Sequence, residues 1–231
     1  MSTDILSLSH VTVAQRGPRQ PGLTDLNLAL ASGTIVFVRI EHASDVLPLA
    51  DVAQGLLTPD SGTVEFRGRN WARVRPGRAA RMRGRIGRVF PENTWLSNLD
   101  LLENVVLRVR HNSLRRDSEI MDELAALAEA LNVPMPGHSR PADLQADDSR
   151  AMQWLRALLG DPVLLVLEQP ELGIAPGRAA RFAERILAAA AEGAAVLWIT
   201  GSRATLEHPG FREAGHFAMQ GDRVIPDVEE K

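Results

Sequence analysis

The spacing of apolar side chains predicts a strand-rich beginning to this chain. Apolar residues occupy every second position over 5–15 and again over 23–33, a pattern typical of half-buried antiparallel strands. Residues 63–71 repeat the pattern, with a turn expected at Gly68. Between them, the apolar run Ile35 to Val38 predicts a buried strand from Ile35 to Arg39, followed by an amphipathic helix ending near Gly55.

The rest of the chain is first helical and then alternating. Residues 98–132 and 147–162 carry helical apolar spacing, and the second helix is stopped by Gly160 and Pro162. The continuous apolar runs 163–167 and 194–200 predict strands covered on both faces, with a helix over 176–193 between them. Strand, helix and strand at this spacing indicate a parallel sheet with right-handed crossovers.

Composition narrows the classes of function. The chain has 231 residues, 45% of them apolar, no cysteine and a formal net charge of −3. We therefore expect a globular protein without disulfides, zinc–thiolate sites or a membrane span, in the cytoplasm. Only one of the 26 basic residues is a lysine, Lys231 at the C-terminus, which excludes any mechanism that needs a lysine inside the fold.

The turn after the first buried strand lacks the residues of a phosphate site. Strand, turn and helix in this order form the usual frame of a phosphate-binding loop, but residues 40–47 contain neither glycine nor lysine. Pro48 suits only a first helical turn, so we expect Asp45 to cap the helix. Its carboxylate would repel each phosphate charge by ~4 kcal/mol at ~4 Å with an effective dielectric of ~20.

Four marker stretches, at 55–64, 86–105, 156–176 and 194–200, carry a family resemblance. Their order and spacing resemble the nucleotide-binding subunit of ABC transporters from about residue 5 to residue 224. The resemblance implies an α/β, P-loop NTPase-like ABC ATPase fold. A mostly parallel core sheet, an N-terminal antiparallel β subdomain and a helical subdomain at roughly 92–160 are expected within one domain, 1–231.

At the positions where that family holds nucleotide, this chain carries other residue types. The phosphate-loop glycines correspond to Ile40, Ala43 and Asp45, the lysine to Val46 and the hydroxyl to Leu47. The other positions correspond to Gln15 for the adenine-stacking aromatic, Pro91 for the glutamine, 144–148 for the signature, Glu168 and Gln169 for the two strand-end acids, Ala175 for the following aspartate and Gly201 for the late histidine. In the stretch 144–148, we expect the carboxylates of Asp147 and Asp148 to occupy a helix N-terminus and cap it. From all these departures we predict no catalytic residue, no cofactor and no metal.

These departures lead to a functional hypothesis with two alternatives. The chain is expected not to be an enzyme but a catalytically inactive subunit that supports or regulates a membrane transporter at the inner face of the cell membrane. Residues 101–114 resemble the ATPase subunits of bacterial MCE-type lipid transporters, which suggests a lipid cargo. One alternative is an atypical nucleotide-binding ABC ATPase subunit acting in a heterodimer, and the second is an arginine-rich scaffold that binds nucleic acid.

Partner contacts are expected at two surfaces. In ABC systems a groove beside the stretch 89–96 receives a short helix of the membrane subunit, or permease, which assigns partner docking to Phe90, Pro91, Glu92, Trp95, Leu96 and Leu99. Alternatively, Trp95 packs into the helical lobe. A homodimer or a heterodimer with an active ABC ATPase is the further partner expected.

The second surface is an arginine run from 67 to 88, which contains nine arginines and no acid. Such a run suits anionic lipid headgroups, nucleic acid or an acidic partner, and a solvated surface is the alternative. Few aromatic residues interleave with the arginines, so binding of single strands by base stacking is not favoured and no nucleic acid partner is expected.

Overall fold

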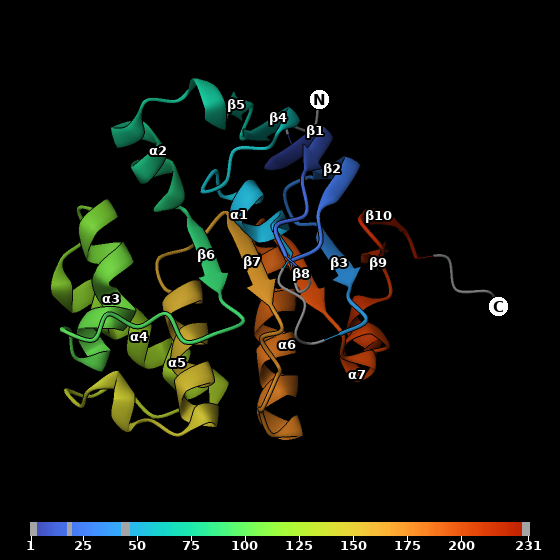
Figure 1. Ribbon diagram of the computed structural model, residues 1–231. Helices are drawn as coiled ribbons and strands as arrows, with labels where there is room; N and C mark the ends of the chain where they lie inside the picture. The colour runs from blue at the N-terminus through green and yellow to red at the C-terminus, as the bar shows by residue number, and fades with distance from the viewer. Residues whose placement is uncertain (1–3, 18–19, 43–46, 228–231) are drawn as a thin grey trace.

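The N-terminal part of the chain forms an antiparallel sheet, as the alternating pattern predicts. In the computed structural model, which describes residues 4–17, 20–42 and 47–227, this sheet has the strand order β2-β1-β4-β5 (Figure 1). The strands are β1 Leu6–Val13, β2 Leu23–Leu30, β4 Ser61–Phe66 and β5 Arg69–Asn70. Arg67 and Gly68 both have positive φ, 52° and 67°, in the turn between β4 and β5.

The second sheet is mostly parallel and has the order β10-β9-β3-β8-β7-β6. Its strands are β3 Ile35–Arg39, β6 Ile86–Val89, β7 Leu164–Glu168, β8 Ala195–Thr200, β9 Gly215–Gln220 and β10 Arg223–Pro226. All neighbours are parallel except the β9–β10 hairpin. Every residue of β7 and β8 is buried, which explains their continuous apolar runs.

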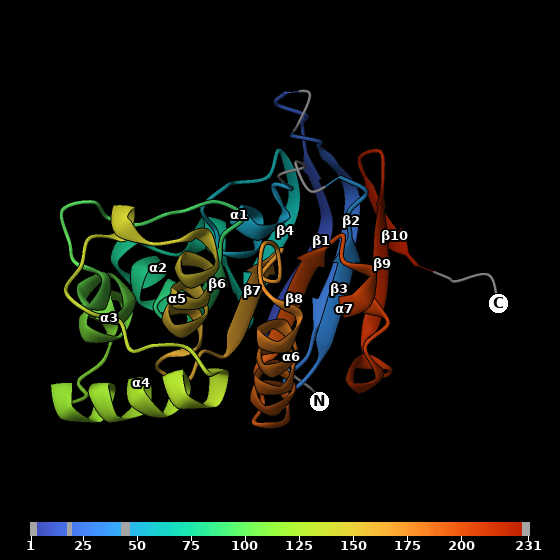
Figure 2. The same ribbon diagram turned by 90° about the horizontal axis from the view of Figure 1, so that it is seen from below.

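Helices pack on both faces of this sheet, and a group of helices lies beside its β6 edge. The α-helices are α1 Leu49–Ala53, α2 Pro76–Arg83, α3 Leu101–Asn112, α4 Asp117–Leu131, α5 Ala146–Leu158, α6 Pro176–Ala191 and α7 Arg203–Leu206, and the short 3-10 helices are η1 Trp71–Arg73, η2 Pro141–Asp143 and η3 Pro209–Phe211. Helices α3, α4 and α5 gather beside β6, away from the β9–β10 edge (Figure 2). Among the described residues, no helix has the length and apolar character needed to cross a membrane.

Local sequence signals account for the ends of the helical segment. Asp100 caps α3 by accepting a hydrogen bond from the Glu103 amide, and the Glu103 carboxylate accepts one from the Asp100 amide in return. Helix α4 ends at Asn132, whose left-handed conformation (φ 51°) lets its amide bond back to the last turn. These helices fall inside the predicted subdomain 92–160, whose bounds stay a prediction.

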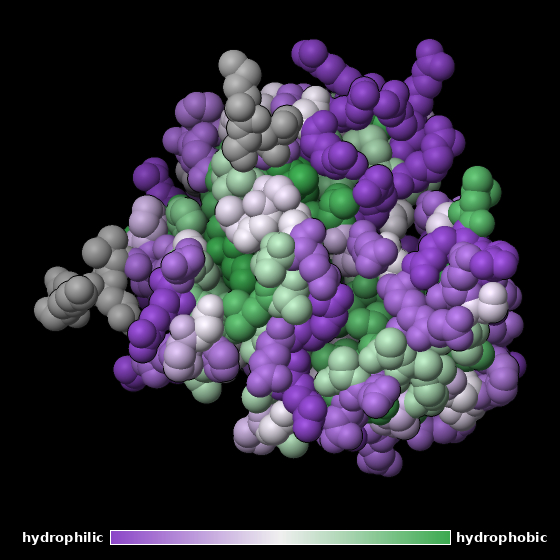
Figure 3. Space-filling view, turned by 180° about the vertical axis from the view of Figure 1, so that it is seen from behind, coloured by the Kyte–Doolittle hydropathy of each residue, from purple (hydrophilic) through white to green (hydrophobic). Residues whose placement is uncertain are grey.

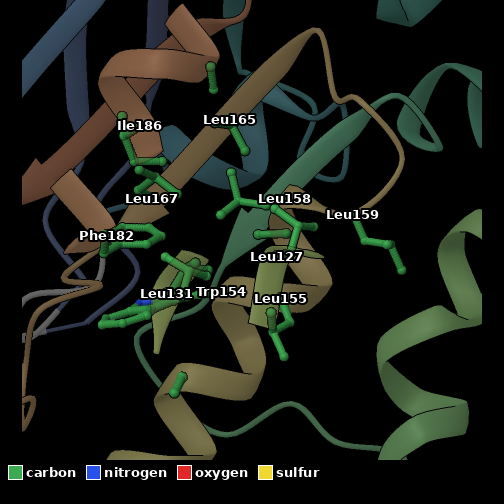
Figure 4. Packing of buried hydrophobic residues seen from close by; sticks show 14 of the residues in the cluster. Leu127, Leu131, Trp154, Leu155, Leu158, Leu159, Leu165, Leu167, Phe182 and Ile186 are labelled. Atoms are coloured by element: carbon green, nitrogen blue, oxygen red, sulfur yellow. The ribbon is translucent and has the colours of Figure 1, made fainter. Parts of the chain in front are cut away.

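The six-stranded sheet separates two hydrophobic clusters, one on each face. In the larger cluster α5 packs between α4 and the sheet, and Trp154 stacks on Phe182 of α6 with ring centroids 4.4 Å apart (Figure 4). The Trp154 indole also donates to the Pro170 carbonyl oxygen at 3.0 Å. A Cβ on Gly87 would lie 2.0 Å from the Ala157 carbonyl oxygen, so β6 and α5 approach as closely as only glycine permits.

Candidate functional site

The phosphate-loop position lies at the carboxyl end of β3. The Ile40 amide donates to the Thr200 carbonyl oxygen at 3.0 Å, which extends the pairing of β3 with β8. The predicted positions Ala43, Asp45 and Val46, with the expected Asp45 cap, lie outside the described residues. The position that corresponds to the family's hydroxyl is Leu47, whose side chain is buried in the smaller hydrophobic cluster. Helix α1 follows directly, with Pro48 before its first residue.

At the carboxyl end of β7, a carboxylate is held by an arginine of the neighbouring strand. Arg88 Nε of β6 donates to Glu168 Oε2 at 2.8 Å, and its Nη1 donates to Asp51 Oδ1 of α1 at 2.6 Å. The Arg88 and Glu168 side chains are almost fully buried, 8% and 4% exposed, whereas Asp51 is half exposed. One guanidinium therefore ties together a helix and two strands at this edge of the sheet.

Burial and charge act in opposite directions on Glu168. Removal from water raises the pKa of the Glu168 carboxyl above its ordinary value, and the positive charge and hydrogen bonds of Arg88 partly oppose that rise. Beside it, Gln169 adopts a positive φ of 47°, and its amide donates to the Ile199 carbonyl oxygen at 2.8 Å. Among the described residues, no group of three or more acidic or histidine side chains could hold a metal ion.

A second buried carboxylate lies just beyond this strand end. Glu171 accepts hydrogen bonds from the Thr200 hydroxyl and from the Trp198 indole nitrogen, the latter at 3.2 Å. Burial raises the pKa of Glu171, and these two donors partly oppose the rise. Glu171 was not among the residues singled out by sequence, because the partners it meets lie about thirty residues away on β8.

The stretch 144–148 corrects one expectation. We expected its two carboxylates to cap the helix that follows, but Gln145 precedes α5 and makes no capping hydrogen bond with its side chain. Asp147 and Asp148 lie within the first turn of α5, and each pairs with Nη1 of Arg178 on α6 at 3.1 Å. The two acids therefore link α5 to α6, because an ionic partner from another helix lies within their reach.

A cavity of about 510 Å³ opens at the carboxyl edge of β3 and β8. Its lining includes Arg39, Gly201, Arg203, His216 and Asp227. Arg39 makes two hydrogen bonds to the Asp227 carboxylate, at 2.7 and 3.0 Å. This is the edge of a parallel sheet at which ligands of open α/β folds bind.

A second cavity, of about 550 Å³, lies between the β6 edge of the sheet and helix α3. Of the six residues assigned to docking, Phe90 and Leu96 line it. We call this cavity the groove; its lining residues are Gln54, Arg83, Ile86, Arg88, Phe90, Thr94, Leu96, Asn104, Leu107, Arg108, His111, Asn112 and Arg156. The residues from α3 were not among those assigned to docking from the sequence, although Leu107 is 43% exposed.

Of the two roles that the sequence left open for Trp95, packing into the helical lobe is observed, and docking stays a prediction. Trp95 is half-buried against the larger cluster, and its indole nitrogen donates to Ser149 Oγ of α5 at 2.9 Å. Its outer ring face carries the Arg156 guanidinium, 4.5 Å from the ring centroid. Trp95 therefore supports the wall of the groove through Arg156, whose pKa burial lowers to about 10.

The remaining assigned residues, Pro91, Glu92 and Leu99, make backbone hydrogen bonds in this region. The Pro91 carbonyl oxygen accepts from Arg150 Nη2 at 2.9 Å, and the Glu92 carbonyl oxygen accepts from Gln153 at 3.4 Å. The Leu99 amide donates to the Leu96 carbonyl oxygen at 3.2 Å in the turn before α3. These contacts fix the path of the segment beside the groove.

Sequence comparison finds relatives among importer proteins. No protein-family model matches the chain. It is 26% identical over 180 residues to the autoinducer 2 import ATP-binding protein LsrA of Enterobacter sp. (strain 638), covering 78% of this chain and 35% of LsrA. It is 28% identical over 170 residues to the taurine import ATP-binding protein TauB of Pseudomonas aeruginosa, covering 74% of this chain and 60% of TauB.

Coverage of these relatives is partial. A further relative is the sulfate/thiosulfate import ATP-binding protein CysA of Mesostigma viride, 29% identical over 150 residues. The match spans 64% of this chain and 41% of CysA. The chain therefore spans between about a third and three fifths of the length of these curated relatives.

Solved structures share the fold over nearly the whole chain. The dimeric structure of a post-hydrolysis state of an ATP-binding cassette, bound to ADP and Pi, superposes with a TM-score of 0.82 at 17% identity and covers 98% of both chains. An ATP-binding subunit of an ABC transporter superposes with a TM-score of 0.80 at 20% identity, over 95% of this chain and 88% of that one. The predicted ABC ATPase fold is thereby confirmed.

The same comparisons overturn one expectation. We expected a protein that is not an enzyme, because the family's catalytic residue types are missing. The relatives are ATP-binding proteins, and one fold neighbour is a cassette in a post-hydrolysis state with ADP and Pi, so the similarity points to an enzyme. The expectation rested on the side chains at the nucleotide positions alone. Sequence relatives and fold neighbours together support assignment of the chain to the ATP-binding subunits of ABC transporters.

Proposed function

We propose that the chain is an atypical ATP-binding subunit of an ABC import system, working as a dimer at the inner face of a membrane and docked to a permease. The observation that carries this proposal is the cassette fold, matched over 98% of the chain by a dimeric ATP-binding cassette. The sequence relatives are ATP-binding proteins of import systems, which favours import over other uses of the fold. No nucleic acid partner is suggested by any of these relatives.

The proposal stops at import and names no cargo. The relatives are import proteins for autoinducer 2, sulfate or thiosulfate, and taurine, which share no single chemical class. A lipid cargo, suggested by residues 101–114, has no support from these relatives. Under this proposal the contacts that select cargo would belong to the permease.

Nucleotide binding in this subunit has to use arginine in place of lysine. The single lysine, Lys231, is at the C-terminal end of the sequence, and 40–47 contains no glycine to bring backbone amides close to phosphates. The 510 Å³ cavity at the end of β3 offers Arg39 and Arg203, on the strand edge where nucleotide is expected. Arginine contacts phosphate through a planar fork of N–H groups, so this substitution changes geometry but keeps the charge. A heterodimer, in which a second cassette supplies further contacts, is the form of dimer we favour.

The groove is the proposed docking surface for the permease. Leu96 and Leu107 line the groove and are 47% and 43% exposed, and Phe90 lines it with the Arg88 guanidinium 4.3 Å from its ring centroid. Two exposed leucines beside a hollow of this size suit the apolar side of a helix from a partner. Trp95 is not among the lining residues of the groove but contacts Arg156, which is, and direct contact of Trp95 with a permease stays a prediction.

The experiment isolates the tagged chain from membranes of its host and measures the permease retained and the ATP hydrolysed by the retained complex. We expect both with the wild type, loss of the permease with L96Q/L107Q, and reduced hydrolysis with a retained permease for Arg203→Gln. The matched control is L56Q/L172Q, because Leu56 and Leu172 are 55% and 49% exposed but lie outside the groove. Absence of hydrolysis in a complex that retains the permease would refute the ATPase part, and retention by L96Q/L107Q would refute the groove.

A further inference from the structure

Seven arginines form a basic surface over β5, η1, α2 and the turns beside them. We call it the arginine face; its members are Arg67, Arg69, Arg73, Arg75, Arg78, Arg81 and Arg85. All seven side chains are exposed, and within the described residues none of them forms an ion pair with an acidic group. Of the two other arginines of the run, Arg83 is half-buried and the Arg88 side chain is almost fully buried, and both form hydrogen bonds within the fold. Two arginines of the run, Arg83 and Arg88, therefore bond within the fold, and the other seven are exposed to solvent.

The arginine face is hollowed rather than flat. Two cavities of about 550 and 570 Å³ lie on it, and both are lined by Arg69, Arg78 and Arg81. Phe66 and Met82 contribute apolar atoms to the first. Three guanidinium groups around a shared hollow match a group with several charged oxygens, such as a phosphate, because each guanidinium donates in a fork.

Charge is distributed unevenly over the molecule. The run 67–88 holds nine of the 26 basic residues and none of the 29 acidic ones, so the remaining chain carries 17 basic against 29 acidic residues, a net charge of −12. A negatively charged surface therefore attracts one side of this protein and repels the rest. Figure 3 shows strongly hydrophilic side chains projecting over the region of α2 and β5. An extended anionic surface would bind with this side first.

We propose that the arginine face binds the phosphate headgroups of an anionic lipid surface. The choice of lipid over free phosphate rests on the proposed function, because α2 joins the two surfaces: its Arg83 lines the groove and its Arg81 lines the hollows. A permease helix in the groove would place the adjacent arginine face near the headgroups of the same membrane. Each exposed arginine then strengthens binding to an anionic membrane about fivefold.

The aromatic rings beside the arginine face, Phe66 and Trp71, are not available for stacking on nucleic acid bases. Phe66 is buried and stacks on Trp71 with ring centroids 5.7 Å apart, and the Trp71 indole donates to the Ala53 carbonyl oxygen at 3.1 Å. Both rings near the arginine face are thus engaged within the fold. A duplex contacted only through its phosphates remains the competing polyanion, and the experiment includes it.

The experiment is sedimentation of the purified full chain with vesicles of phosphatidylcholine alone or of phosphatidylcholine with phosphatidylglycerol. We expect binding only to the vesicles with phosphatidylglycerol, reversed by salt, and weakened about a hundredfold in R69Q/R78Q/R81Q. The matched control R181Q/R212Q/R223Q removes the same charge from exposed positions elsewhere and should bind like the wild type. Neither permease nor ATP enters this test, so its failure is separate from failure of the proposed function.

Three outcomes would overturn the proposal. Equal loss of binding in the two triple variants would show that net charge, not the arginine face, is responsible. Wild-type binding by R69Q/R78Q/R81Q would place the contact elsewhere. Displacement from the vesicles by inorganic phosphate or by a short DNA duplex, at charge concentrations below that of the lipid, would make the face a site for those anions instead. A thermal melt of each variant confirms that the fold is intact.

Discussion

Arg88→Gln is expected to destabilise the fold through the charge it leaves behind. Glu168, with a side chain 4% exposed, would lose the guanidinium that now lies 2.8 Å away, while Asp51 is 49% exposed and can return to water. Removing one partner of a buried ion pair costs roughly 3–5 kcal/mol, and the exposed pair adds about 1 kcal/mol or less. We expect a loss of about 3 kcal/mol, since Glu168 can escape part of the cost by taking up a proton.

The pH dependence of that loss identifies its cause. Burial raises the pKa of Glu168, and Arg88 is the largest influence opposing the rise, so the variant carboxyl should have a still higher pKa. A carboxyl with a raised folded pKa binds its proton more tightly in the folded state. The free energy of unfolding is therefore greatest in acid and falls as the pH rises from the unfolded pKa to the folded one. The loss in Arg88→Gln should be smaller at about pH 5 than at about pH 8.

Thermal unfolding followed by circular dichroism is the assay. A loss of about 3 kcal/mol lowers Tm by roughly 6–12 °C in a chain of this length. Arg85→Gln, an exposed neighbour without an ion pair among the described residues, is the matched control and should melt like the wild type. R88Q/E168Q removes the buried charge and should recover part of the loss. An equal loss at both pH values, with no recovery in the double variant, would attribute the effect to packing on Phe90 and refute the reasoning.

Two further predictions test the frame around the site. Gly87→Ala should lower Tm strongly, because its Cβ would lie 2.0 Å from the Ala157 carbonyl oxygen. Gly77→Ala, in the first turn of α2, has open space around its Cβ and should raise the free energy of unfolding by up to about 1 kcal/mol. Arg178→Gln should cost about 1 kcal/mol in low salt and less in high salt, because the pairs it makes with α5 are partly exposed; a salt-independent loss measured by urea unfolding would contradict an ionic origin.

Elements with a strong local pattern could be predicted from the sequence. The unbroken apolar runs became β7 and β8, and the alternating stretches became β1, β2 and β4, because burial on two faces or on one leaves a direct trace in residue order. Strand β6 was not predicted, since it has four residues and includes Arg88, which reads as a surface residue. The β9–β10 hairpin was also missed because its mixed burial gives no clear alternation.

The candidate site depended on contacts that no local pattern encodes. Sequence placed Glu168 at a strand end, but its partner Arg88 lies 80 residues earlier on a strand that pairs with it only in the folded sheet. The same reason applies to Asp147 and Asp148, which read as caps because a carboxylate in a first helical turn usually serves that helix. Their partner, Arg178, comes from the following helix.

The positive charges at the carboxyl edge of the sheet come from arginines outside the loop 40–47. A phosphate-binding scaffold ordinarily provides a lysine and backbone amides from the loop between strand and helix, and 40–47 contains neither lysine nor glycine. Here the cations are Arg88 at the end of β6, which joins two carboxylates, and Arg39 and Arg203 around the 510 Å³ cavity. A guanidinium keeps its charge even when buried, so these positions hold positive charge without help from a ligand. Under the proposed function, an incoming phosphate would compete with the carboxylates already paired there, and the strength of binding would be set by how readily Asp227 releases Arg39 and Glu207 releases Arg203.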